Sequence, residues 1–283
     1  MFVDILGRAK LKIGINIACS DCEENKLELA SLYASEGYDA LCMPLIYKYT
    51  PECEIAGLKI LSSVAYIFGE DCEQGKKISV IGIGMTSDPD IPDDWRHMVK
   101  TSLQKAGEAI RQINRHGGIS VVILEDCHTF EKEDLIKLCD ADLIEASSMS
   151  HEIFSALTTK DKYPSVILID TDRPGSSIVI DANDFSSHSI VLSIRAGRFF
   201  STEGPELHLS QISPERVIIN CSAAKRVAYY TSSTSPSVEV LEGDDYIVPE
   251  YAIKENDTFI MASIFDSDRK RAFSSTHKIL KLV

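Results

Sequence analysis

The chain has 283 residues, of which 44% are hydrophobic and 25% are charged, and its 43 Asp and Glu outnumber its 29 Lys and Arg. This composition is ordinary for a globular protein and excludes collagen-like, coiled-coil and disordered chains. The net charge of −14 repels phosphate backbones and anionic lipid, so we expect neither general nucleic-acid binding nor membrane binding.

No apolar run is long enough to cross a bilayer, and the first residues lack the basic and apolar segments of a secretory signal, so we expect a cytoplasmic protein. The eight cysteines are then expected to be reduced thiols. Cys19 and Cys22 have the spacing of half a zinc site or of a redox pair. The sequence has no second CxxC pair, which favours free thiols.

The first two thirds of the chain alternate between strand-like and helix-like patterns. Strands are expected at residues 12–18, 40–43, 59–66, 77–83, 119–124, 142–146 and 166–170, and helices at 23–36, 95–115, 132–138 and 152–158. The clearest helix is 95–115, because its apolar residues recur at helical spacing and a Gly pair follows its end. Repeated βα units of this kind predict a parallel sheet or a barrel.

After residue 200 the helical periodicity stops and short alternating runs appear. Strands are expected at residues 216–220, 226–230, 237–241 and 258–265, with turns at 231–236 and 242–245. We therefore predict an α/β protein with a first domain at residues 1–200 and a small β domain at residues 201–283.

Several stretches of the sequence occur in an order that is typical of one protein family. The main ones are residues 29–41, residues 113–122 with Arg-His-Gly-Gly-Ile-Ser, residues 142–146 (Asp-Leu-Ile-Glu-Ala), and residues 194–205 with Ala-Gly-Arg-Phe-Phe-Ser-Thr-Glu-Gly-Pro. Together with residues 220–222 and 268–274, they resemble the PHP (polymerase and histidinol phosphatase) superfamily of metal-dependent phosphoesterases. The resemblance implies a PHP-like distorted (β/α)7 barrel followed by a small C-terminal β domain.

The positions that the resemblance assigns to metal ligands are mostly changed. Such a family site holds one to three metal ions with His and carboxylate side chains at the C-terminal ends of the barrel strands. Only Asp170 is kept at these positions, and Asp172 stands where the family has a His. The other matching positions are occupied by Asn16, Ala18, Leu45, Ile46, Ala65 and Leu124.

Ala, Leu and Ile side chains have no lone pair, and without a metal cluster no water is made acidic at neutral pH. We therefore predict a catalytically degenerate protein that needs no cofactor and binds a small molecule or a protein partner. A structural subunit that assembles through its β domain is a further interpretation. The sequence does not indicate the ligand, the partner or the oligomeric state.

The alternative is an active metal-dependent phosphoesterase with a rebuilt site that holds Mn²⁺, Zn²⁺ or Fe²⁺. The site would be built around Asp170, Asp172 and His128, with Glu125, Asp126 and a Cys as further candidate ligands. Two interpretations stay open for other residues: Arg173 could neutralise the neighbouring acids, and Glu145 could be hydrogen-bonded to nearby backbone. The candidate pocket comprises Asn16, Glu125, Asp126, His128, Glu145, Asp170, Asp172 and Arg173.

Overall fold

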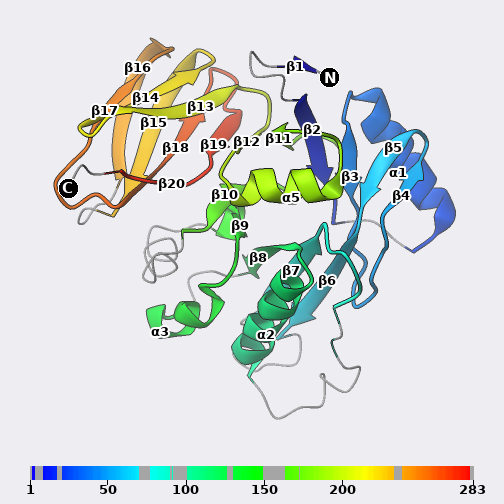
Figure 1. The fold of residues 1–283 in the computed structure, drawn as a ribbon. Helices are drawn as coiled ribbons and strands as arrows, with labels where there is room; N and C mark the ends of the chain where they lie inside the picture. Colours follow the sequence, from blue (N-terminus) through cyan, green and yellow to red (C-terminus); the bar gives the residue numbers. More distant parts are fainter. Residues whose placement is uncertain are drawn as a thin grey trace.

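The computed structural model describes residues 2–3, 9–17, 21–69, 77–89, 91, 101–125, 130–148, 163–171, 173–232 and 238–280. These residues form a mixed α/β fold with sheets of twelve, five and three strands. Figure 1 shows the C-terminal strands gathered at one end of the molecule, with α2 (Ser102–Arg115) at the other end and α5 (Ser187–Arg195) between them. None of the described helices is long and apolar enough to cross a membrane.

The N-terminal part of the large sheet is built around β2 (Ala9–Ile15). This strand pairs in parallel with β3 (Ala40–Cys42), which pairs in parallel with β5 (Leu58–Leu61). On its other side β2 pairs antiparallel with β11 (Ser177–Ala182). The strand predicted at residues 12–18 is confirmed in its first part, residues 12–15, and the strand predicted at residues 40–43 is confirmed at residues 40–42. The predicted helix at residues 23–36 is confirmed as α1 (Glu23–Ser35), which ends before Gly37.

The five-stranded sheet has the order β10-β9-β8-β7-β6. Its strands are β6 (Ser63–Phe68), β7 (Lys77–Ile83), β8 (Ile119–Glu125), β9 (Leu143–Glu145) and β10 (Ser165–Ile167). Strands β8, β9 and β10 are parallel, whereas β7 runs antiparallel to both of its neighbours. The strand predicted at residues 59–66 is divided at Ser62 into β5 and β6, which belong to different sheets.

Two isolated parallel bridges connect the large sheet with the five-stranded sheet. One joins Asn16 to Asp170 and the other joins Ile46 to Ala65. The two sheets also share a hydrophobic core, in which Ile13 of β2 clusters with Val121 of β8. Because these links are single bridges and β7 is antiparallel, the pairings give a mixed α/β fold and not an uninterrupted parallel barrel.

Helix α2 covers the five-stranded sheet with its buried apolar face, as its helical spacing predicts. The helix predicted at residues 95–115 is confirmed over residues 102–115, with Thr101 as its N-cap in an extended conformation, and residues 95–100 lie outside the described residues. Residues 132–138 form α3 (Lys132–Leu135) and the 3-10 helix η3 (Ile136–Leu138). The helix predicted at residues 152–158 lies outside the described residues.

The C-terminal part adds strands to the large sheet and packs a second, three-stranded sheet against them. The added strands are β12 (Phe199–Thr202), β15 (Ala224–Thr231), β16 (Val238–Tyr246), β18 (Phe259–Phe265), β19 (Arg271–Ser274) and β20 (His277–Lys278). The three-stranded sheet consists of β13 (Leu207–Ser213), β14 (Arg216–Cys221) and β17 (Glu250–Ala252). The remaining elements are β1 (Phe2–Val3), β4 (Cys53–Ile55) and the 3-10 helix η4 (Ala146–Ser148). The large sheet runs across residue 200, and the division into two domains stays a prediction.

The turn predicted at residues 242–245 is wrong, because these residues lie inside β16. Opposite them on β15 the pairing shifts register between Ala224 and Arg226, whose partners are Tyr246 and Glu242. The Gly and Asp residues that favour a turn are therefore accommodated by an irregularity of the strand pair.

The N-terminus of α2 allows a first test of the fold. Thr101 accepts a hydrogen bond from the Gln104 backbone N at 3.3 Å, and the Gln104 side chain accepts one from the Thr101 backbone N at 2.9 Å. We expect Thr101→Ala to lower the free energy of unfolding by about 1 kcal/mol, because it removes this capping box. Urea denaturation checks this, with Thr101→Ser as the control that keeps the hydroxyl. Equal midpoints for the two variants would contradict the assignment.

Candidate functional site

Asp170 lies three residues after the end of β10 and forms the centre of a buried hydrogen-bond cluster. Tyr33 donates its hydroxyl proton to Asp170 Oδ2 at 2.7 Å. Ser176 donates to Asp170 Oδ1 from both its backbone N at 2.8 Å and its hydroxyl at 2.7 Å. Asn16 donates from Nδ2 to the Tyr33 oxygen at 3.2 Å. We call Asn16, Tyr33, Asp170 and Ser176 the Asp170 cluster.

Two features of the local sequence place Tyr33 in this cluster. It lies on the buried side of α1, and its ring packs over Gly14, where an added Cβ would be only 2.4 Å from Tyr33 Cε1. The Tyr38 ring contacts the Tyr33 ring edge-on, with centroids 4.7 Å apart. Burial raises the pKa of the Tyr33 hydroxyl, and the negative charge of Asp170 raises it further. Tyr33 therefore acts as a hydrogen-bond donor at neutral pH.

The described residues do not fit a metal cluster at the positions that the resemblance assigns. Leu45, Ala65 and Leu124 are buried and apolar, and Ile46 is 58% exposed. Within the described part of the chain, no group of three His, Cys, Asp or Glu side chains is arranged to hold a metal ion. Ala18 lies outside the described residues.

Among the described residues, the side chains of Glu125, Glu145 and Arg173 make no hydrogen bond or ion pair with the Asp170 side chain. Glu125 is opposite Lys77 on β7 and pairs with its ammonium at 3.0 Å. Glu145 accepts a hydrogen bond from the Ser147 backbone N at 2.8 Å, as in the backbone-bonded interpretation. Arg173 is exposed and makes no ion pair with another described residue. Outside the described residues lie Asp126, His128, Asp172 and Cys19.

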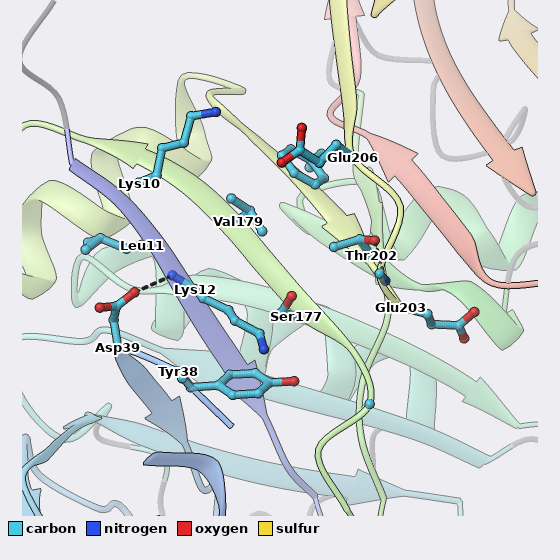
Figure 2. Close-up of a pocket in the computed structure, with 14 residues that line it drawn as sticks. Lys10, Leu11, Lys12, Tyr38, Asp39, Ser177, Val179, Thr202, Glu203 and Glu206 are labelled. Atoms are coloured by element: carbon cyan, nitrogen blue, oxygen red, sulfur yellow. Dashed lines mark hydrogen bonds between the residues drawn. The ribbon is translucent and has the colours of Figure 1, made fainter. Parts of the chain in front are cut away.

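Sequence reasoning missed a groove on the outer face of β2, β11 and β12, shown in Figure 2. Its volume is about 390 Å³. Among the residues that line it are Lys10, Lys12, Tyr38, Ser177, Val179 and Phe200. Alternation along β2 is the only sequence signal: Leu11 and Ile13 face the core, so Lys10 and Lys12 lie on the opposite face.

Charges inside the groove are partly neutralised by the protein itself. The Lys12 ammonium donates to the Glu36 carbonyl oxygen at 3.0 Å and lies 3.9 Å from the centroid of the Tyr38 ring. Burial lowers the pKa of Lys12, against the opposing effect of nearby carboxylates. On the other side, Glu203 is bound by Arg271 Nη2 at 2.7 Å.

Comparison with known proteins finds similar chains among solved structures. No family model matches the chain, and no curated protein matches it. Among solved structures, the chain is similar to a two-domain protein from Bacteroides vulgatus ATCC 8482, described as containing a predicted PHP-like metal-dependent phosphoesterase. The similarity covers 99% of this chain and 97% of that one, with 11% identity and a TM-score of 0.44. Similarity at this level does not establish a shared activity.

Proposed function

We propose that this chain is a PHP-like protein that has lost metal-dependent phosphoester hydrolysis and acts by binding a ligand or partner. The observation that carries the proposal is the hydrogen bonding of Asp170. Three donors, from Tyr33 and Ser176, point at its two carboxylate oxygens. A metal ion needs lone pairs directed at it, whereas the surroundings of this carboxylate present hydrogens.

The two isolated bridges support the barrel that the resemblance implies. Asn16 with Asp170 links β2 to the end of β10, and Ile46 with Ala65 links the segment after β3 to β6. We infer a distorted ring of strands in the order β2-β3-β5-β6-β7-β8-β9-β10. The Asp170 cluster lies where the ring closes, between the ends of β10 and β2. In this ring Leu45, Ala65 and Leu124, which stand at positions of the family's metal ligands, are buried apolar side chains, whereas Ile46 is exposed.

Elemental analysis of untagged protein purified without chelator tests the proposal. We expect far less than one Mn, Zn or Fe per chain. On the same sample we expect no phosphoesterase turnover when Mn²⁺, Zn²⁺ or Fe²⁺ is added, and no rise in Tm, because an ion that binds only the folded state would raise Tm.

The opposite result would favour the rebuilt site of the alternative. Near-stoichiometric metal with turnover that is lost in both His128→Ala and Asp172→Asn would contradict the proposal. Lys48→Met serves as the control variant, because Lys48 is exposed and its ion pair with Asp21 lies outside this set of residues. The cytoplasmic location and the absence of nucleic-acid partners stay predictions from the sequence.

A further inference from the structure

We propose that the groove on the outer face of β2, β11 and β12 binds a small organic acid, with one carboxylate group and an apolar body. The proposal goes beyond the loss of hydrolysis, since it assigns a binding site and a ligand class. It rests on the register of the three strands, on the unused hydrogen-bond donors and on the size of the groove.

The strand register places a positive charge beside an apolar strip. Lys12 of β2 is opposite Val179 of β11, and Val179 is opposite Phe200 of β12. Two residues before Val179 on β11, Ser177 is opposite Thr202 and lies on the same face of the sheet. Because side chains of neighbouring strands at paired positions lie on the same face, the floor of the groove passes from an ammonium group to two apolar side chains.

Several hydrogen-bond donors in the groove have no partner within the part of the protein that the structure describes, whereas most of the nearby acceptors already accept a hydrogen bond or form an ion pair. Ser177 is only 5% exposed, yet its hydroxyl has no hydrogen-bond partner among the described residues. Lys12 uses one of its three ammonium donors, and Lys10 makes no ion pair within the described part of the chain. By contrast, the Thr202 hydroxyl donates to the Pro205 carbonyl oxygen at 2.6 Å and accepts from the Gly204 backbone N at 2.8 Å.

A carboxylate matches these unused donors. Its two oxygens accept hydrogen bonds from ammonium and hydroxyl groups, and charge-assisted bonds of this kind are the strong ones. In a chain with a net charge of −14, an anion needs nearby cations, which Lys10 and Lys12 supply. Of the three carboxylates that line the same groove, Glu203 is paired with Arg271 and Asp39 accepts a hydrogen bond from the Lys12 backbone N, which leaves Glu206. Burial lowers the pKa of Lys12, and a bound anion would compensate for the lost hydration of its ammonium group.

The groove also limits the size and the polarity of the rest of the ligand. A volume of about 390 Å³ suits a small molecule, and Val179, Phe200 and the Tyr38 ring offer it an apolar surface. Glu206 lines the same groove, and its carboxylate has no ion-pair partner among the described residues. This negative charge disfavours a phosphate dianion relative to a monocarboxylate.

Calorimetric titration of the full chain with phenylacetate tests the proposal, with phenylacetamide and inorganic phosphate as comparators. We expect saturable binding of phenylacetate and binding at least about tenfold weaker for phenylacetamide, which has the same shape but no charge. Phosphate is expected not to bind. The protein is first treated with EDTA and dialysed, so the result does not depend on whether the barrel holds a metal.

Two variants locate the binding to the groove. We expect Ser177→Ala and Lys12→Met each to weaken phenylacetate binding about tenfold, since each removes a donor to a charged group. Ser177→Ala removes only the unpartnered hydroxyl, so it keeps the test valid if Lys12→Met fails to fold. Lys48→Met, which removes an exposed lysine elsewhere, should leave binding unchanged. Absence of phenylacetate binding, equal binding of phenylacetamide or phosphate, or an unchanged affinity in Ser177→Ala would overturn the proposal.

Discussion

Asp170→Ala is expected to lower the free energy of unfolding by about 3–5 kcal/mol, because several buried donors lose their acceptor together. The Tyr33 hydroxyl, the Ser176 backbone N and the Ser176 hydroxyl all donate to this carboxylate. The change is a large part of the roughly 5–15 kcal/mol that stabilises a typical domain. Urea denaturation followed by circular dichroism measures it as a lower midpoint.

Asp268→Ala is the matched control for this variant, because Asp268 is exposed and its side chain makes no hydrogen bond with a described residue. Its effect should stay within about 0.5 kcal/mol. A double-mutant cycle with Tyr33→Phe then isolates the cluster, since the effects of residues in contact do not add. Additive effects of Asp170→Ala and Tyr33→Phe would show that the two side chains do not act together.

Gly14→Ala is expected to cost about 2–3 kcal/mol, because a side chain at this position overlaps the buried Tyr33 ring. The added Cβ would be 2.4 Å from Tyr33 Cε1, 2.7 Å from Cδ1 and 3.1 Å from Leu41 Cδ1. Tyr33 is 0% exposed and is held by both Asp170 and the Tyr38 ring, so it has no free space to move into. Thermal and urea denaturation of the purified variant measure the loss.

Gly175→Ala provides the control beside the same cluster. Its added Cβ would be 3.6 Å from Asp170 Oδ1, an ordinary van der Waals distance, so we expect a change within about 0.5 kcal/mol. In a Tyr33→Leu background the additional cost of Gly14→Ala should largely disappear, because the overlapping ring is gone. An equal cost in both backgrounds would mean that the Tyr33 ring is not the cause.

The elements predicted from local patterns agree best with the structure. The strand at residues 77–83 is confirmed with the same bounds, and α1 differs by a single residue at its end. Alternation and helical spacing depend on residues close in the sequence, which explains this success. The division at Ser62 and the irregularity in β16 depend on partner strands, so no local pattern could indicate them.

Of the candidate site, only the proximity of Asn16 and Asp170 could be predicted from the sequence. The order of the motifs placed both residues in the same candidate pocket, and the structure joins them by a parallel bridge. Tyr33 is 137 residues from Asp170, and its role depends on the space above Gly14, which the sequence does not reveal. The groove escaped prediction for a similar reason, because Lys12 is joined to Val179 and Phe200 only by strand register.

The position of β2 between β3 and β11 also affects how the chain acquires its fold during synthesis. Strand β3 follows β2 within a short stretch of chain, but β11 and Asp170 are made much later. Until they leave the ribosome, one edge of β2 has no β11 to pair with and Tyr33 lacks its acceptor. Pairing between such distant segments slows folding, because a long loop must close before any contact forms. The nascent chain is therefore expected to complete this region late and to depend on protection of the β2 edge until then.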